Sequence, residues 1–393
     1  MTAYHEKFRD FFARTERAWG FCDDKSSKAE LLRLMRNFVE LQRDFVMQYP
    51  VSEDWNANET MRDVPRSRLY APFSGKVLDA YAHIPFCQTR CTYCNFHIVA
   101  GAKSVAEFES AYLDRVEAEI AEFAGAVPDF SVRTFFVGGG TPSFLSLSGL
   151  AKLLGIVRKY LAPHFEEGYE FTFEGNPDSF DARKFKMLKE NGANRVSLGV
   201  QTFDEPIIAR INRTYSAKRV EDAFAEARAA GFDDINIDMM YGLPGQSIET
   251  MRRDLDAVLA LAPEHLTYYP LYYYEASVLG KIRKSDTEEK EAVLDLVYDF
   301  YRELREKVDA AGYFRYGREY FSKGDKYRHQ YENDYVSGMP LAGFGHSAYS
   351  YNGREVFVRD SDFSTYMAAE PRETVVRGHV YSTEDSDRRK MVL

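Results

Sequence analysis

The amino-acid sequence predicts an α/β protein built around a parallel β-sheet. Six short runs rich in β-branched and aromatic residues alternate with amphipathic stretches of helical periodicity. The runs cover residues 77–84, 132–139, 169–175, 195–201, 234–242 and 265–273. Strand-then-helix units in series build a parallel sheet through right-handed crossovers. Six units fit either an open doubly wound sheet or a partial TIM-like barrel, and both place functional groups at the carboxyl ends of the strands.

The segments between the runs carry apolar residues at the spacing of three and four that is typical of helices. We expect helices over residues 105–124, 147–162, 181–192, 217–231, 248–262 and 289–312. Gly192 and Gly231 stand where two of these helices end. Glycine is common there because it readily adopts the left-handed conformation of a helix C-terminus.

The chain divides into three segments. Residues 1–75 predict a helical N-terminal extension, because 26–48 have helical periodicity, followed by a polar connector with several prolines. Residues 76–285 hold the six strand–helix units. Residues 286–393 combine one helix with what reads as irregular strands and loops, and we expect a C-terminal α+β segment there.

The composition argues against two classes of protein. Lys and Arg number 51 against 61 Asp and Glu, a net charge of −10, so we expect no nucleic-acid partner. No apolar run is long enough to cross a bilayer, and the N-terminal residues lack the apolar core of a secretory signal. The sequence therefore predicts a cytoplasmic protein with no membrane partner.

Three of the four cysteines lie within eight residues, at Cys87, Cys91 and Cys94. In a reducing compartment such a group indicates metal or redox chemistry rather than a disulfide framework. Structural zinc usually takes four ligands, so His83 or His97 would have to complete a zinc site. Three thiolates instead suit a [4Fe–4S] cluster that keeps one iron open for an outside ligand. We predict that these cysteines bind a catalytic metal centre.

Distinctive polar motifs follow the expected strands in turn. GGGTP follows the second strand, EGNPD the third and GVQTF the fourth, and Asp238 lies in the fifth. Because the carboxyl ends of parallel strands meet at one edge of a sheet, these motifs converge with the cysteines.

Seven ordered motifs then point to a known family. CxxxCxxC after a first strand, with YxHIPFC, GGGTP, ExNP, NRxSxGVQ, DxxYGLPGQ and GFGxSAYS, resembles the radical S-adenosylmethionine (radical SAM) superfamily and its HemN-like group, over about residues 78 to 367. That group includes oxygen-independent coproporphyrinogen III dehydrogenases, the haem chaperone HemW and radical C-methyltransferases. The resemblance implies a partial TIM-like (β/α)6 barrel, a [4Fe–4S] cluster and SAM. One electron from the cluster would cleave SAM to a 5′-deoxyadenosyl radical.

The resemblance also implies which residues bind SAM. For a first SAM they are Tyr81, Tyr93, Gly139, Gly140, Thr141, Glu174 and, more weakly, Tyr349. The glycines and Thr141 would offer backbone amides to the methionyl carboxylate, although a tight turn needs glycine without any ligand. Glu174 would hold the methionyl ammonium. For a second SAM, which we also expect, the residues are Gln201, Arg213, Asp238 and Tyr272.

Three functions are compatible with this resemblance. We rank first an enzyme that transfers a methyl or methylene group from the second SAM to an sp² carbon of a small-molecule substrate. The second is an oxidoreductase acting on tetrapyrroles, which decarboxylates coproporphyrinogen III or breaks down haem, and the third is a HemW-like haem chaperone. A flavodoxin or ferredoxin would be the reductant.

Three departures from the family pattern guide this ranking. The decarboxylating dehydrogenases carry a further cysteine after the triad, where this chain reads NFHIVAG. The haem chaperones begin close to the first strand, whereas some 75 residues precede it here. The final EDSDRRKMVL resembles the opening of a helical substrate domain, before which the chain stops.

Overall fold

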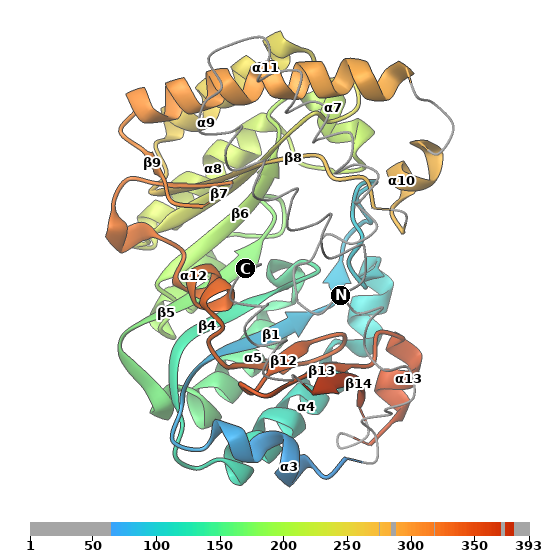
Figure 1. Cartoon of the computed structure of the whole chain (residues 1–393), viewed down its shortest axis with the longest axis vertical. Coiled ribbons are helices and arrows are strands. Elements are labelled where there is room, and N and C mark those ends of the chain that lie inside the picture. The colour runs from blue at the N-terminus through green and yellow to red at the C-terminus, as the bar shows by residue number, and fades with distance from the viewer. Residues whose placement is uncertain (1–63, 275, 284–287, 318, 371–373, 381–393) are drawn as a thin grey trace.

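The structure is a computed structural model. It describes residues 64–274, 276–283, 288–317, 319–370 and 374–380 (Figure 1). Most of the predicted N-terminal extension therefore lies outside the described residues. Its described end forms the short helix α3 (Arg66–Tyr70) and leads directly into the first strand.

Six parallel strands form the centre of the sheet. They are β1 (Val77–Ile84), β4 (Ser131–Gly139), β5 (Phe165–Gly175), β6 (Arg195–Gln201), β7 (Ile235–Tyr241) and β8 (His265–Pro270). Each pairs in parallel with the next one along the chain. All six predicted strands are confirmed, although β5 begins at Phe165 rather than at residue 169. Their carboxyl ends therefore share one edge of the sheet.

The strand order decides between the two predicted architectures. The six central strands follow chain order without a reversal, so no switch point of the doubly wound kind lies among them. β1 and β8 pair with other strands instead of with each other, so the barrel does not close. The fold is the partial TIM-like (β/α)6 barrel that the resemblance implied.

The predicted helices are present between and after these strands. They are α4 (Ala102–Ala126), α5 (Leu147–Tyr160), α6 (Ala182–Glu190), α8 (Ala217–Ala229), α9 (Ile248–Leu261) and α11 (Glu288–Ala310). Figure 1 shows the sheet curving between α9 and α11 at one end and α4 and α5 at the other. Two short helices, α7 (Glu205–Arg210) and α10 (Val278–Arg283), were not predicted. Neither spans two full turns, so neither shows a helical periodicity in the sequence.

Local side-chain bonds explain where these helices begin and end. Four of the six long helices start after a residue whose side chain accepts a hydrogen bond from the backbone three positions later: Ser146, Asp181, Ser216 and Ser247. Gly192 and Gly231 have φ angles of 94° and 91° just past α6 and α8. Their predicted role in ending these two helices is confirmed.

The C-terminal segment extends both sides of the same sheet. Its strands are β9 (Phe314–Arg315), β10 (Tyr320–Ser322), β11 (Leu341–Phe344), β12 (Tyr349–Tyr351), β13 (Glu355–Arg359) and β14 (Val375–Val380). The complete order is β14-β13-β12-β11-β1-β4-β5-β6-β7-β8-β10-β9. The segment is thus more regular than its sequence suggested. Besides α11, its described helices include α12 (Gln330–Ser337) and α13 (Phe363–Ala368).

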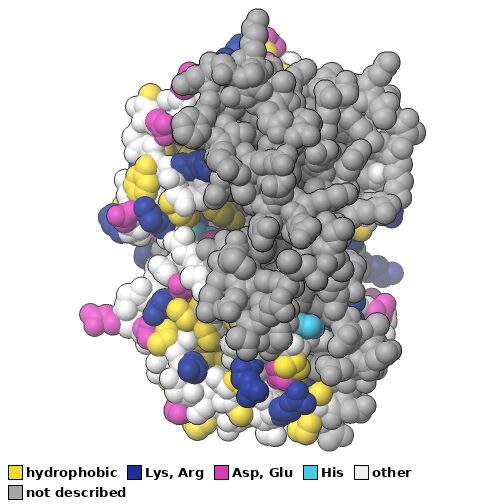
Figure 2. All heavy atoms as spheres, in the orientation of Figure 1, with side chains coloured by type: hydrophobic (Ala, Val, Ile, Leu, Met, Phe, Trp, Pro, Cys, Tyr) yellow, Lys and Arg dark blue, Asp and Glu magenta, His cyan; other side chains and the backbone are white. Residues whose placement is uncertain are grey.

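Two observations relate to the partners expected from the sequence. Among the described helices, none combines the length and the apolar character that crossing a membrane requires. On the face shown in Figure 2, the described basic and acidic side chains are interspersed, so no band of one sign runs across it.

A buried ion pair joins the C-terminal strands to α4. Arg359 Nε lies 3.1 Å from Glu119 Oε2, and the two side chains are 2% and 0% exposed. Glu119 also accepts hydrogen bonds from the Gly345 amide, from the Tyr366 hydroxyl and from Thr374 Oγ1. Because each lone pair of the carboxylate has a donor, the cost of burying this charge is offset.

We predict that Glu119→Gln lowers the free energy of unfolding by about 3–5 kcal/mol, because it leaves the buried Arg359 charge uncompensated. Urea unfolding followed by circular dichroism measures the loss. The control is Asp222→Asn, which breaks an exposed pair with Lys218 and should cost less than about 1 kcal/mol. Equal losses in the two variants would show that the buried pair does not hold the C-terminal strands.

Candidate functional site

The cysteine loop leaves the carboxyl end of β1 and is fixed at its base. The short strands β2 (Phe86–Cys87) and β3 (Val99–Ala100) pair in parallel across the loop. At its tip, the Thr92 amide donates to the Ile211 carbonyl, and the Thr92 carbonyl accepts from the Leu279 amide. The loop is thus held between the core and the segments around α7 and α10.

All three cysteines of the loop are free thiols. Cys87 is buried, with its Sγ 3.3 Å from Thr141 Oγ1, whereas Cys91 and Cys94 are partly exposed. Burial raises the pKa of Cys87 to about 12 and also raises that of Cys94. Such thiols ionise when a metal replaces the proton, so metal binding here would release protons.

The arrangement of ligands bears on the choice between zinc and an iron–sulfur cluster. Among the described side chains, no three His, Cys, Asp or Glu could share a single metal ion. In a [4Fe–4S] cluster each thiolate binds a different iron, so the three sulfurs need not converge on one point. Three thiols in this loop suit a [4Fe–4S] cluster with one open iron.

The cysteines open onto a cavity at the carboxyl ends of the strands. The ends of β4, β5, β6, β7 and β8 form its other walls, as the strand-end motifs predict. The lining residues include Cys87, Cys91, Cys94, Tyr93, Gly139, Gly140, Thr141, Glu174, Gln201, Arg213 and Asp238 from the predicted set. They also include Asn176, Ser197, Gly199 and Tyr269, which were not among the residues assigned to the cluster or to SAM. Eleven of the fourteen predicted residues are thus brought to one cavity.

The glycine turn after β4 packs tightly against β1. A Cβ on Gly140 would lie 2.7 Å from the Pro85 backbone, so only glycine fits there. The Gly140 and Thr141 amides donate to the carbonyls of Ile84 and Phe86. These two amides are therefore engaged within the protein, which corrects the expectation that they face a ligand carboxylate. The alternative of a tight turn accounts for them.

Glu174 stands at the end of β5 with its carboxyl group at the cavity wall. Burial, above all, raises its pKa to about 8, and repulsion by Asp238 adds to the rise, whereas a hydrogen bond from Gly139 lowers it. A Cβ on Gly138 would lie 2.6 Å from Glu174 Oε2, so this glycine makes room for the carboxyl group. A cationic ligand would stabilise the charged form of Glu174.

Arg213 connects the cysteine loop to the strand ends. Its guanidinium donates to the Tyr93 hydroxyl at 2.9 Å, to Asn176 Oδ1 at 3.2 Å and to the Gly199 carbonyl. It also interacts electrostatically with Cys91. Arg213 was predicted to lie around a second SAM. In this structure Arg213 joins three protein segments around the cavity.

Gln201 ends β6 in a strained conformation. Its φ angle is 69°, in the left-handed region that few residues other than glycine adopt. Its side chain is buried and accepts a hydrogen bond from the Tyr269 hydroxyl at 2.9 Å. Such strain persists where the surrounding structure enforces it, and it is concentrated at functional sites.

Three predicted tyrosines do not line the cavity, which corrects their assignment to its wall. Tyr81 stacks on Phe136, and its hydroxyl lies 2.9 Å from His83 Nδ1. Tyr272 donates a hydrogen bond to Glu319. Tyr349 packs edge-on against Tyr335. Packing within the protein thus accounts for these positions.

The sequence contained weak signals for the residues that were missed. Asn176 belongs to the ExNP motif that already supplied Glu174, and Tyr269 belongs to a run of tyrosines near the end of β8. Ser197 faces the same side of the sheet as Gly199 and Gln201, because alternate residues of a strand share a face. Nothing local distinguishes them from ordinary strand residues.

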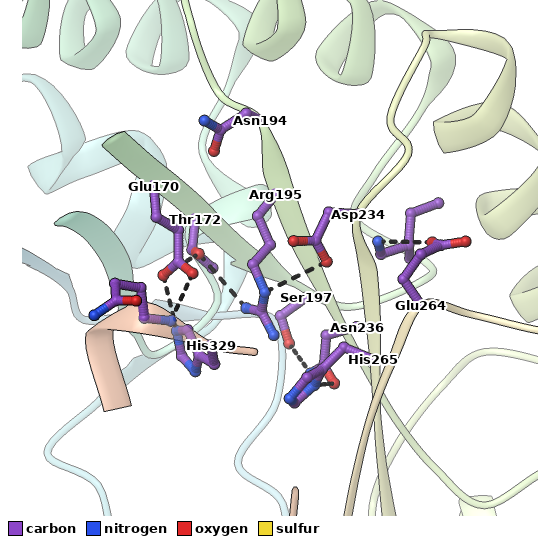
Figure 3. Close-up of polar contacts among 12 residues, drawn as sticks. Glu170, Thr172, Asn194, Arg195, Ser197, Asp234, Asn236, Glu264, His265 and His329 are labelled. Carbon is purple, nitrogen blue, oxygen red and sulfur yellow. Dashed lines mark hydrogen bonds and ion pairs between the residues drawn. The ribbon is translucent and has the colours of Figure 1, made fainter. Parts of the chain in front are cut away.

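A polar layer fills the barrel beneath the cavity (Figure 3). Arg195 is almost fully buried, with Nε 3.7 Å from Asp234 Oδ1. Glu170 accepts a hydrogen bond from the Gln330 amide at 2.8 Å, and its Oε1 lies 3.4 Å from His329 Nε2. Barrel interiors are usually filled by branched apolar residues. Here polar contacts instead anchor the start of α12 inside the barrel.

Comparison with known proteins agrees with this site. Residues 81–258 match the model of the radical SAM superfamily. The chain is 32% identical over 324 residues to the haem chaperone HemW of Bacillus subtilis (strain 168), covering 80% of this chain and 82% of that protein. It is 29% identical over 310 residues to HemW of Escherichia coli (strain K12), covering 78% of each chain.

A solved structure supports the fold. Coproporphyrinogen III oxidase (HemN) from Escherichia coli superposes with a TM-score of 0.76 at 23% identity, over 88% of this chain and 81% of that chain. The motifs, the partial barrel and the identity to HemW proteins all agree. The chain therefore belongs to the radical SAM superfamily and, within it, to the HemN-like group.

Proposed function

We propose that this protein binds a [4Fe–4S] cluster through Cys87, Cys91 and Cys94, binds SAM in the adjoining cavity, and carries haem as its HemW relatives are named for doing. The observation that carries the proposal is the meeting of three free thiols with Glu174 and Asp238 around one cavity. When bound and reduced, the cluster supplies the electron that cleaves SAM.

Different residues of the cavity bind the cluster and the separate parts of SAM. The three thiolates hold three irons and leave one open. Glu174 accepts from the methionyl ammonium, whose charge favours the ionised carboxylate. Asp238 accepts from ribose hydroxyls. Arg213 keeps Tyr93 and the cysteine loop in position against the strand ends.

The choice among the three predicted functions changes with these relatives. The relatives that are 32% and 29% identical to this chain are named haem chaperones, so they give no support to the predicted methyl transfer. The number of SAM molecules stays a prediction. Two residues expected around a second SAM, Gln201 and Arg213, already bond to Tyr269 and Asn176. A flavodoxin or ferredoxin as electron donor also stays a prediction.

We predict that Cys91→Ala abolishes the broad visible absorbance of the anaerobically reconstituted protein, because two thiolates hold a cluster poorly. Absorbance and iron content measure the loss. Cys22→Ala is the matched control, because it removes the one cysteine outside the motif, and it should leave both quantities unchanged. Full iron content in Cys91→Ala would contradict the assignment.

We predict that Glu174→Gln stabilises the protein increasingly as the pH rises from 4.5 to 8. The folded wild type keeps a proton on Glu174 that the unfolded chain releases in this window, so its stability falls by up to about 1.4 kcal/mol per pH unit. Glutamine has no such proton. Urea unfolding across the window measures the difference, and the exposed Glu190→Gln serves as control. A gain that does not change with pH would refute the shift.

Product analysis separates the functions. The reconstituted wild type is reduced with dithionite and given SAM, with and without haem. Tight haem binding with little SAM cleavage supports the chaperone. 5′-Deoxyadenosine with S-adenosylhomocysteine would instead indicate methyl transfer. 5′-Deoxyadenosine together with decarboxylated coproporphyrinogen or degraded haem would indicate a tetrapyrrole enzyme.

A further inference from the structure

A chain of hydrogen bonds runs from the cavity wall into the barrel. Asp238, which lines the cavity, accepts from Asn236 Nδ2 at its Oδ1 and from Ser197 Oγ at its Oδ2, both at 2.8 Å. Asn236 Nδ2 also lies 2.8 Å from Ser197 Oγ. Behind Asn236 stands His265, whose Nδ1 is 2.6 Å from Asn236 Oδ1 (Figure 3).

The chain continues into the C-terminal segment. His265 Nε2 lies 2.5 Å from the hydroxyl of Tyr316, in the turn between β9 and β10. The Tyr316 oxygen accepts from the backbone amide of His329 at 3.0 Å. Tyr316, which follows Asp238 by about 80 positions in the chain, is thereby linked to Asp238.

The direction of each bond follows from the chemistry of its ends. In its ionised form the Asp238 carboxylate only accepts, so Asn236 must turn its amide nitrogen toward it. Asn236 Oδ1 then faces His265 and also only accepts, so the proton of His265 sits on Nδ1. His265 Nε2 is left to accept from the Tyr316 hydroxyl. Every donor in the chain thus points toward Asp238.

Burial makes this arrangement stable. Asn236, Ser197 and His265 are each no more than 3% exposed, so water does not compete for their bonds. Burial, and then the Arg195 charge, lower the pKa of His265 well below its usual value and keep the ring neutral. Burial raises the pKa of Tyr316, so its hydroxyl keeps the proton that it donates.

Other groups around Asp238 do not replace this chain. Arg195 lies below and favours the charged carboxylate, whereas Glu174 faces it across the cavity and disfavours that charge. Tyr269 and Tyr320 approach from β8 and β10, and burial raises the pKa of each, so both stay neutral. Thr267 also interacts with Asp238 and donates to Asn236 Oδ1 at 3.1 Å, so it belongs to the same network. Asn236 and Ser197 each donate to one oxygen of Asp238 and thereby orient its carboxyl group.

We propose that Asn236, His265 and Tyr316 are positioning residues that hold Asp238 in one orientation as a hydrogen-bond acceptor at the cavity wall, ready for the hydroxyl groups of a bound nucleoside. The identity of the ligand as a nucleoside depends on the proposed function, whereas the hydrogen-bond network does not. None of the three touches the ligand in this scheme. Each acts through Asp238.

Two measurements on the cluster-containing protein test the proposal. Nitrogen-15 NMR of labelled histidines reports which nitrogen of His265 carries the proton, and equilibrium binding gives the Kd for SAM. The variants are Asn236→Ala and Tyr316→Phe. The matched control is Tyr313→Phe, which removes a buried hydroxyl that donates to the Pro263 carbonyl outside the network.

We expect wild type and Tyr313→Phe to show His265 protonated on Nδ1, with Nε2 as a hydrogen-bonded acceptor. In Tyr316→Phe the Nε2 signal should move to that of an unbonded acceptor. Losing hydrogen bonds of ordinary strength should weaken SAM binding about tenfold in Asn236→Ala and about two- to fivefold in Tyr316→Phe, with no change in Tyr313→Phe.

Four outcomes of these measurements are distinguished. A wild-type His265 protonated on Nε2 overturns the proposal, and so does a SAM Kd that is the same in both network variants and in the control. If Asn236→Ala does not fold, Tyr316→Phe alone decides. If the wild type binds no SAM, the proposed function fails, and the NMR result still decides whether the network is present.

Discussion

Parallel pairing of six strands in chain order is the constraint on which the site depends. Because neighbouring strands run in the same direction, their carboxyl ends reach one edge, and motifs separated by up to some 150 residues meet there. The cysteine loop starts at this edge, at the end of β1, and is closed by the β2–β3 pair. Any shift of β1 against β4 would separate Cys87 from Thr141.

Buried carboxyl groups inside the barrel lower the stability of the fold. Asp79 and Glu174 both have a pKa raised to about 8, mainly by burial, and neither has an ion-pair partner as close as that of Glu119. Carboxyl groups held in this way oppose folding, and natural proteins keep such groups where function requires them. Glu174, at the cavity wall, thus differs from Glu119, whose charge Arg359 neutralises.

The C-terminal segment contributes to the barrel as well as to the sheet. β11 and β10 cover the two open sides of the parallel strands. The turn that carries Tyr316 and the start of α12 place side chains and backbone amides inside the barrel, against His265 and Glu170. The site is thus supported from beneath by residues that follow it in the chain.

The sequence by itself determined the strands, the main helices, the cysteine spacing and the edge where the motifs meet, because periodicity, helix caps and chain order are local properties. Only the tertiary structure decided which donors are already engaged. It showed Arg213 bonded to Tyr93 and Asn176, the Gly140 and Thr141 amides bonded to the carbonyls of Ile84 and Phe86, and Tyr81 and Tyr349 packed against Phe136 and Tyr335. These contacts join residues tens to hundreds of positions apart, and the backbone path that brings them together leaves no local pattern.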